Sequence, residues 1–251
     1  MNKYWIIGIV SVFLILGWLF WPVQAVPILA YHQVGDEDEI YSVPASQFEE
    51  QMRYLSENGY HSISLEELFA SYSGTATLPD KPVIITFDDG YSDNYLTALP
   101  IMKKYGLSAT VFIVPSLIGT PDYLSWEQVV KMQEQHMEIG SHTMSHAGMN
   151  EISPKEQRWE TAESKAVLER QLGTPIRYFA YPYGQFSPAV EQILKEEGYR
   201  GACTGLTGLN DSKTDPYALK RINIPRPKYG YGLWEFRLRL FRAQLYSKLG
   251  L

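Results

Sequence analysis

KPVIITFDDG, at residues 81–90, decides the fold class of this chain. Residues 83–87 are apolar or β-branched, and Asp88, Asp89 and Gly90 follow them directly. Near-continuous hydrophobicity is typical of a strand that is covered on both faces, as strands of a parallel sheet are. The polar residues and the glycine mark the end of the strand and the start of a turn. The stretch therefore predicts a buried parallel strand that carries two carboxylates at its carboxyl end.

Similar apolar runs recur along the chain and alternate with amphipathic stretches. They lie at residues 26–32, 108–115, 137–142 and 177–184, with weaker candidates at 61–65, 200–205 and 219–225. Ser46, Ser153 and Ser187 stand where the intervening helices would begin, and Gly59, Gly173 and Gly198 where they would end. This alternation is the signature of βα units around a parallel sheet. We therefore predict an α/β fold: a distorted (β/α) barrel of about seven units, preceded by an N-terminal hydrophobic helix.

The first part of the chain, residues 1–25, indicates where the protein works. Residues 4–21 carry no charge and follow Lys3, and their length is about that needed to cross a bilayer. We favour a transmembrane anchor over a signal peptide cut after Ala25, because the apolar core is long and ends in bulky aromatic residues. A buried helix of a soluble fold is disfavoured, since the stretch is apolar on all faces. The anchor and the signal peptide both put the barrel, residues 26–228, outside the cytoplasm, at the membrane or secreted.

The charge of the chain is unevenly distributed. The formal net charge is −6; residues 1–25 carry +1 and residues 229–251 carry +3, which leaves −10 for residues 26–228. Because phosphate binding needs clustered lysine and arginine, the acidic body argues against a nucleic-acid partner. Cys203 is the single cysteine, so an intrachain disulfide is excluded and a metal site needs other ligands.

The C-terminal part, residues 229–251, has the pattern of a basic amphipathic helix. One stripe of it is apolar and comprises Trp234, Leu238, Phe241, Leu245 and Leu249. The four basic residues of this segment lie largely outside the stripe; they are Arg237, Arg239, Arg242 and Lys248. The stripe either packs against the barrel or lies on a membrane surface, where basic residues would meet anionic lipid.

Two polar motifs suggest a catalytic metal site. Asp88 and Asp89 end a predicted strand, where reactive residues of a (β/α) barrel gather, and two adjacent carboxylates there call for a cation or a proton between them. His142 and His146 are four residues apart in SHTMSH, a spacing used by pairs of metal-binding histidines on a helical turn. A helix N-cap for the aspartates and a chance surface pair for the histidines remain alternatives. Together the residues offer mixed nitrogen and oxygen ligands with room for water, as catalytic metal sites do.

Three motifs resemble those of a known family. In chain order they are TFDDG (86–90), SHTMSH (141–146) and YPYG (181–184), and they resemble the first three motifs of polysaccharide deacetylases, the NodB-homology or carbohydrate esterase 4 family. The opening PILAYHQV (27–34) and FAYPYG (179–184) are more similar to the branch that includes biofilm poly-N-acetylglucosamine deacetylases. The resemblance extends over residues 26–227.

The resemblance implies a metal-dependent hydrolase that removes acetyl groups from N-acetylglucosamine units of a cell-wall or biofilm polysaccharide. Asp88 would be the general base. Asp89, His142 and His146 would hold one divalent metal, usually zinc. The backbone N–H of Tyr183 would help to hold the tetrahedral oxyanion.

The chain departs from the family pattern at two positions. Where many members have an arginine that orients the base, this chain has Ala180, so Arg221 or another basic group would have to take that role, or the role is absent. In the family a late motif usually supplies a histidine as the general acid, but here no histidine follows His146. In the biofilm branch this motif is moved to the start of the barrel, which makes His32 the expected general acid. We expect His32 to face the metal from the side opposite Asp88, with room for an acetamide between them.

His61 and His136 precede predicted strands, so they would lie at the other end of the barrel. Two further functions remain open: a metal amidohydrolase acting on a small N-acyl substrate, and a carbohydrate-binding barrel without turnover. The retained Asp88 disfavours the second, because a site without turnover needs no base.

Overall fold

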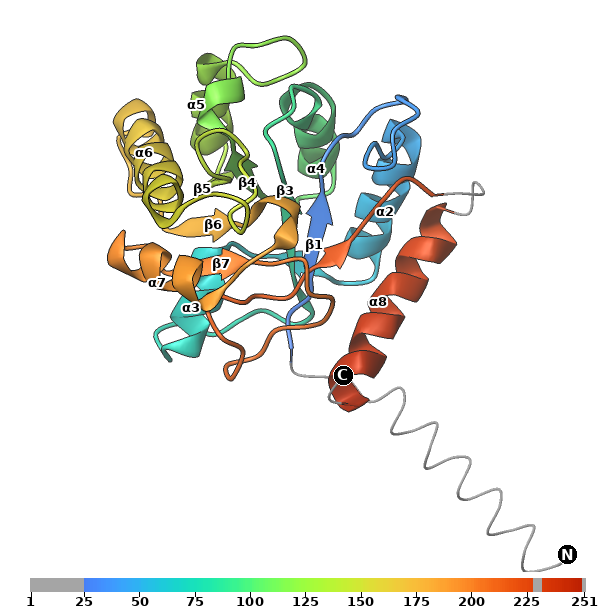
Figure 1. The fold of residues 1–251 in the computed structure, drawn as a ribbon. Helices are drawn as coiled ribbons and strands as arrows, with labels where there is room; N and C mark the ends of the chain where they lie inside the picture. Colours follow the sequence, from blue (N-terminus) through green and yellow to red (C-terminus); the bar gives the residue numbers. More distant parts are fainter. Residues whose placement is uncertain (1–24, 228–231, 250–251) are drawn as a thin grey trace, which may run out of the picture.

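The structure, a computed structural model, describes residues 25–227 and 232–249 and is built around one curled sheet (Figure 1). Every ladder between its strands is parallel. The strand order is β7-β6-β5-β4-β3-β1-β8, and β2 pairs with β3 off this path. In chain order the strands are β1 (Ile28–Tyr31), β2 (His61–Ser62), β3 (Pro82–Phe87), β4 (Thr110–Ile113), β5 (Glu138–Ser141), β6 (Tyr178–Ala180), β7 (Gly201–Cys203) and β8 (Ile222–Asn223).

The curl brings the two ends of this path together. Cys203 of β7 forms an isolated parallel bridge with Leu219, just before β8. The result is a half-barrel of parallel strands surrounded by helices, which confirms the predicted distorted (β/α) barrel. All eight apolar runs that predicted strands contain one.

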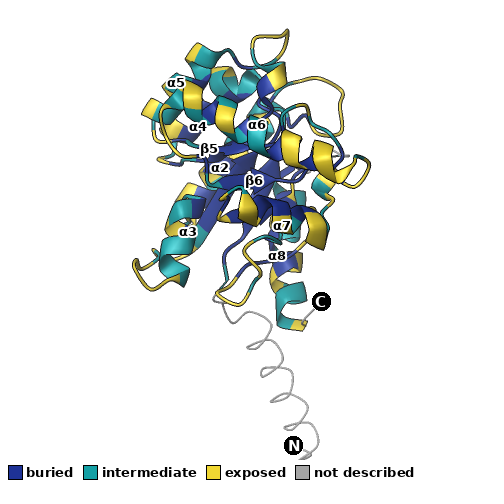
Figure 2. Cartoon of the chain, turned by 60° about the vertical axis from the view of Figure 1, so that its left-hand side comes forward, coloured by how far each residue is buried: buried dark blue, intermediate teal, exposed yellow. Residues whose placement is uncertain are grey.

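Helices cover the outside of the sheet. They are α2 (Ala45–Glu57), α3 (Leu65–Tyr72), α4 (Leu99–Lys104), α5 (Trp126–Glu134), α6 (Pro154–Leu172), α7 (Pro188–Glu196) and α8 (Gly232–Leu249). A π-helical turn (Asn94–Ala98) precedes α4, and 3-10 turns follow β4 (Pro115–Leu117) and β6 (Pro182–Gly184). Figure 2 shows the strands buried at the centre and exposed residues on the outer faces of the helices. All four residues of β1 and of β4 are buried, as strands covered on both faces require.

Most of the predicted helix boundaries are confirmed. Ser153 and Ser187 cap α6 and α7 with their side chains, and Gly173 ends α6 in a left-handed conformation. The prediction for Ser46 is wrong: α2 begins at Ala45, and Pro44 precedes it without a side-chain cap. Pro44 already has the extended backbone of an N-cap, and its carbonyl accepts the first helical N–H bonds, so the helix begins before the serine.

α8 packs on the barrel through a different face from the one that the apolar stripe suggested. Phe236, Leu240 and Ala243 are buried, and the Phe236 ring meets Tyr54 of α2 edge-on at 6.1 Å. Trp234, at the start of the predicted stripe, is 63% exposed. The prediction for residues 1–24 lies outside the described residues. Among the helices that are described, none is both long and apolar enough to span a membrane.

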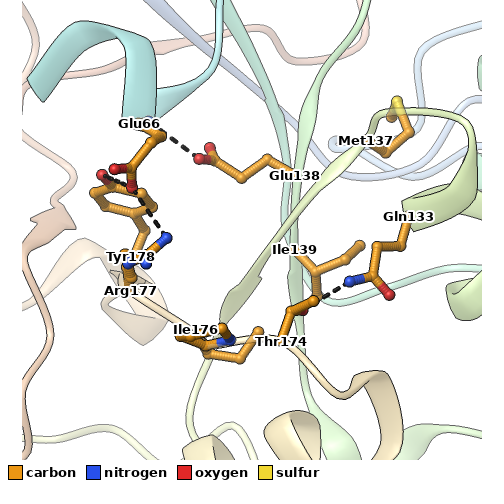
Figure 3. A pocket seen from close by; sticks show the side chains of 10 residues that line it. Glu66, Gln133, Met137, Glu138, Ile139, Thr174, Ile176, Arg177 and Tyr178 are labelled. Carbon is orange, nitrogen blue, oxygen red and sulfur yellow. Dashed lines mark hydrogen bonds and ion pairs between the residues drawn. The ribbon is translucent and has the colours of Figure 1, made fainter. Parts of the chain in front are cut away.

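A cavity of about 290 Å³ opens at the amino ends of β5 and β6, far from the predicted reactive residues (Figure 3). Beside it, the carboxylate of Glu138 accepts the backbone N–H groups of Leu65 and Glu66 and the hydroxyl of Thr110, at 2.9, 3.1 and 2.6 Å. Burial raises the pKa of Glu138. The contacts tie the first turn of α3 to β4 and β5, at the amino ends of the strands, which is the end of a barrel that contributes to stability and not to catalysis. We therefore assign Glu138 a structural role.

Glu138→Ala should destabilise the fold by about 2–4 kcal/mol, because three donors that the carboxylate satisfies lose their acceptor. Denaturant unfolding followed by circular dichroism measures this loss. Glu134→Ala, at an exposed position near the end of α5, is the matched control and should change the free energy of unfolding by no more than about 0.5 kcal/mol. Equal stability of the two variants would show that the Glu138 contacts contribute nothing net.

Candidate active site

The predicted reactive residues meet at the carboxyl ends of the strands. His32 follows β1, Asp88 and Asp89 follow β3, and His142 follows β5. His61 and His136 lie at the opposite ends, because they come at the start of β2 and just before β5. Because the sheet is parallel throughout, the residues that follow each strand all lie at the carboxyl-terminal end of the barrel.

Asp89, His142 and His146 form a cluster suited to a metal ion. Their ligand atoms all lie within 4.8 Å of one another. Asp89 Oδ1 is 3.5 Å from His142 Nε2 and 3.2 Å from His146 Nε2. Bonds of about 2.1 Å to a shared tetrahedral ion would put ligand atoms about 3.4 Å apart. The spacing of these atoms therefore fits one divalent ion.

One carboxylate oxygen in this cluster lacks a hydrogen-bond partner in the described part of the chain. Asp89 Oδ1 is buried, and no donor of residues 25–227 or 232–249 is hydrogen-bonded to it. Burial raises the pKa of Asp89 to about 6, because the ionised carboxyl has lost its water. A cation at this oxygen would replace the missing donor and favour the ionised form. The residues present thus fit a bound metal.

Burial favours the neutral form of both histidines, which is the form that can bind a metal. His142 Nδ1 lies 2.7 Å from the carbonyl oxygen of Ala180, so Nδ1–H donates to it and the lone pair of Nε2 is left for a metal. Burial lowers the pKa of His142 to about 3 and also lowers the pKa of His146. Neutral imidazoles are the form that binds a metal.

Asp88 is not part of this cluster and is held by Arg221. Arg221 Nη1 and Nη2 donate to the two carboxylate oxygens of Asp88 at 2.7 and 2.8 Å, and both side chains are buried. Burial raises the pKa of Asp88, but the charge and hydrogen bonds of Arg221, together with His142 and His32, outweigh this effect and hold that pKa well below its usual range. Arg221 comes just before β8. It contacts Asp88 as expected of a residue that replaces the family arginine missing at Ala180.

His32 lies beside Asp88. The two side chains approach to 3.9 Å, between His32 Nε2 and Asp88 Oδ2. The expectation that they face each other across an acetamide is therefore wrong for this structure. β1 and β3 are neighbours, with Tyr31 opposite Phe87, so the next residue of each strand emerges at adjacent points of the rim.

Two side chains that the sequence did not single out hold His32 in place. The Tyr41 ring stacks on the His32 ring at 4.6 Å, and Asn94 Nδ2 donates to the His32 carbonyl at 2.8 Å. Tyr41 comes from the loop after β1, and Asn94 begins the π-helical turn that precedes α4. Neither belongs to a recognisable motif, so only spatial proximity identifies them.

The backbone of the site is strained at four positions. Asp89, Thr143, His146 and Tyr183 have φ of 72, 64, 61 and 58°, a region that residues other than glycine rarely adopt. Such conformations cost roughly 1–3 kcal/mol each and gather at functional sites, where the surrounding structure enforces them. Tyr183 is 66% exposed, and its ring meets that of His146 edge-on at 4.9 Å.

Glu160 on α6 is a further residue that the sequence did not point to. Its carboxylate accepts the backbone N–H of Ser145 at 2.9 Å and the Ser145 hydroxyl at 2.6 Å. Ser145 directly precedes His146, so Glu160 fixes the loop that carries this ligand. Because Glu160 lies in an ordinary helical pattern, no sequence signal distinguishes it from its neighbours.

Glu160→Ala should lower metal affinity by about 10–100-fold, the range typical when a residue that supports a ligand is removed. The reason is that Ser145 and the following histidine lose the acceptor that positions them. Competition with a chelating dye measures the affinity. Glu163→Ala, on the same helix, is the matched control and should leave affinity unchanged; indistinguishable affinities would refute the role of Glu160.

Comparison with known proteins places the chain among deacetylases. The family model described as polysaccharide deacetylase matches residues 75–202. The protein YxkH of Bacillus subtilis (strain 168), provisionally named a polysaccharide deacetylase, is 33% identical over 198 residues, which are 79% of this chain and 71% of YxkH. The poly-beta-1,6-N-acetyl-D-glucosamine N-deacetylase of Escherichia coli (strain K12) is 27% identical over 242 residues, 78% of this chain but 36% of the relative.

A solved structure agrees with this placement. The Streptococcus pyogenes deacetylase PplD in complex with acetate superposes with a TM-score of 0.78 at 28% sequence identity, and the match covers 89% of this chain and 99% of PplD. The similarity thus extends over nearly the whole described barrel.

Proposed function

Because the chain belongs to the polysaccharide deacetylase family, we propose that it uses a divalent metal to hydrolyse N-acetyl groups of an extracytoplasmic polysaccharide. The family makes it a deacetylase, a hydrolase. One observation supports the metal-dependent mechanism most strongly. Asp89 Oδ1, which has no hydrogen-bond partner among the described residues, lies 3.5 and 3.2 Å from the Nε2 atoms of two histidines, while the neighbouring Asp88 is fixed by Arg221.

Asp89, His142 and His146 would hold the metal, with zinc the expected ion for this mixed nitrogen and oxygen set. Bound there, it would polarise the acetamide carbonyl and acidify the attacking water. Asp88 accepts the proton of that water as the water oxygen bonds to the carbonyl carbon. Arg221 holds both Asp88 oxygens, so it orients the base and stabilises its ionised form. The backbone N–H of Tyr183 donates to the developing oxyanion.

His32 supplies the second proton. As the carbon–nitrogen bond breaks, the nitrogen must be protonated to leave as an amine, and imidazole can donate a proton near neutral pH. The attacking oxygen and the departing nitrogen are bonded to the same carbon. Acid and base can therefore act from neighbouring positions, which agrees with the 3.9 Å between His32 and Asp88. The products are acetate and a free amine.

For the substrate, we propose N-acetylglucosamine units of a biofilm or cell-wall glycan. The Escherichia coli relative is named for poly-beta-1,6-N-acetyl-D-glucosamine. Tyr41, 46% exposed, and Tyr183 provide ring faces beside His32 and His146, and sugar rings pack on such faces. The apolar stretch at residues 4–21 supports a position at the outer face of the cytoplasmic membrane.

Acetate release tests this function against the alternatives. The full chain with zinc should release acetate from oligomers of β-1,6-linked N-acetylglucosamine and release much less from a small N-acetyl amino acid. Preference for the small amide would favour an amidohydrolase. Binding of the oligomer with no acetate release at any metal loading would favour a carbohydrate-binding barrel.

His32→Ala should lower kcat by about 10²–10³-fold, within the range of general acid catalysis, and leave metal binding intact. His61→Ala is the matched control, because His61 lies at the other end of the barrel and contacts the Asp80 carbonyl. Steady-state acetate release measures both. Near-normal turnover of the His32 variant would mean that another group protonates the amine.

A further inference from the structure

The outward face of α8 is apolar. Trp234 and Leu249 are 63% and 53% exposed, and Leu238 and Leu245 are half-buried between them. At 100° per residue these four positions form one stripe, which lies on the opposite side of the helix from the buried Phe236, Leu240 and Ala243. The helix therefore has two apolar stripes, and the barrel uses only one of them.

A hollow of about 380 Å³ continues this surface onto the barrel. It is lined by Tyr54 and Tyr60 near the end of α2 and by Trp234 and Leu238 of α8, together with Arg237 and Gln244, among others. The Arg237 guanidinium lies over the Tyr54 ring at 5.4 Å, so aromatic and basic side chains meet in this hollow. Large exposed apolar surfaces bordered by polar residues are typical of sites that meet a protein or a membrane.

The charges around the stripe favour an anionic partner. Arg237 and Arg242 are exposed on its two sides, and Lys248 borders it near the helix end. Glu235 is the one acidic residue between Gly232 and Leu249. Residues 26–228 carry a net charge of −10, whereas residues 229–251 carry +3, so the net charge of this helix is opposite in sign to that of the barrel. A basic helix with an outward apolar face is the pattern of helices that lie in a membrane interface.

The C-terminal end of α8 lies at the end of the molecule where the described chain starts. α8 runs down the side of the barrel, and its last turn lies at the same end as the start of the described chain in both views (Figures 1 and 2). The uncharged stretch at residues 4–21 ends just before Ala25. If this stretch crosses the bilayer, α8 is held within reach of the lipid surface.

We infer that α8 docks on an anionic bilayer through Trp234, Leu238, Leu245 and Leu249, with Arg237 and Arg242 among the lipid headgroups. The binding partner of this face is the lipid surface itself. Indole rings at the level of the headgroups and arginines that reach anionic lipids are the contacts that such a surface offers. The inference concerns how the barrel sits on the membrane and does not depend on the deacetylation reaction.

The test uses the full chain in nanodiscs of phosphatidylcholine, with or without phosphatidylglycerol. Leu238→Cys carries a fluorescent probe, and Trp159→Cys, on an exposed part of α6, carries the control probe. The native Cys203 is buried, so each variant has one accessible thiol. Lipids with brominated acyl chains quench a probe that enters the bilayer, and aqueous iodide quenches one exposed to water.

In discs with phosphatidylglycerol, brominated lipid should quench the probe at 238 and leave the probe at 159 unaffected. Arg237→Glu with Arg242→Glu should lower the ratio of docked to undocked helix by roughly 25-fold or more, since each basic residue near an anionic surface favours binding about fivefold. The probe at 238 should then approach the control.

Three outcomes would overturn the inference. If the probe at 238 is shielded from iodide yet not quenched by brominated lipid, protein covers the face, either a second copy or residues 1–24. If iodide quenches the probe at 238, this face of α8 is exposed to water and is not docked on lipid. If quenching is equal with and without phosphatidylglycerol, the basic residues do not select an anionic surface.

Discussion

Asp88→Asn should lower kcat for deacetylation by about 10³–10⁴-fold while metal still binds, because the amide cannot accept the proton of the attacking water. Arg221 keeps an oxygen to bond in this variant, but it loses a charged partner in a buried place, so stability should also fall. Acetate release gives the rate, and metal analysis of the purified variant gives the occupancy.

The folded state of this variant needs its own control. Thermal unfolding in the presence of zinc should show one cooperative transition at a lower temperature than that of the wild-type chain. A folded, metal-loaded variant with turnover near that of the wild type would contradict the assignment of Asp88 as the base.

Asp89→Asn should have the opposite profile, in which the metal itself is lost. Asp89 provides the only carboxylate of the three-residue cluster, and its buried Oδ1 has no other partner in the described chain. Affinity for zinc should fall by at least about 100-fold, beyond the effect of removing a supporting residue. Activity should be lost at low zinc and return in part as zinc is raised.

Comparison of the two variants at equal zinc tests the division of roles. Asp88→Asn should be saturated with metal and inactive, and Asp89→Asn should be metal-poor. Equal metal loss in both would refute the separate roles of the two neighbouring carboxylates.

The fold was predictable because the central strands, such as β1 and β4, are buried on both faces, whereas the short β2 and β8 are only partly buried. The apolar residues 83–87 predicted β3, and apolar runs of the same kind predicted β1, β4 and β5, because buried parallel strands have nearly continuous apolar sequences. The start of α2 was missed because Pro44 supplies the backbone geometry of an N-cap without a capping side chain. The packing face of α8 was missed because apolar residues occur on both sides of that helix.

For the site, a sequence shows which residues end strands but not how those strands are ordered around the barrel. The pairing of β1 with β3 puts His32 next to Asp88, and the sequence could not reveal that pairing. Arg221 was a candidate because Ala180 left the orienting position empty, and its two bonds to Asp88 appear only in three dimensions. Glu160 acts through Ser145 from a distant helix, so no local pattern could identify it.

The most direct test of metal-dependent deacetylation is acetate release before and after metal removal. The full chain is stripped with a chelator, dialysed, and given β-1,6-linked N-acetylglucosamine oligomers with increasing zinc. The account predicts no acetate release from the stripped protein and recovery that saturates at one equivalent of zinc per chain, with no recovery in Asp89→Asn at that zinc level. Undiminished acetate release from metal-free protein would contradict it.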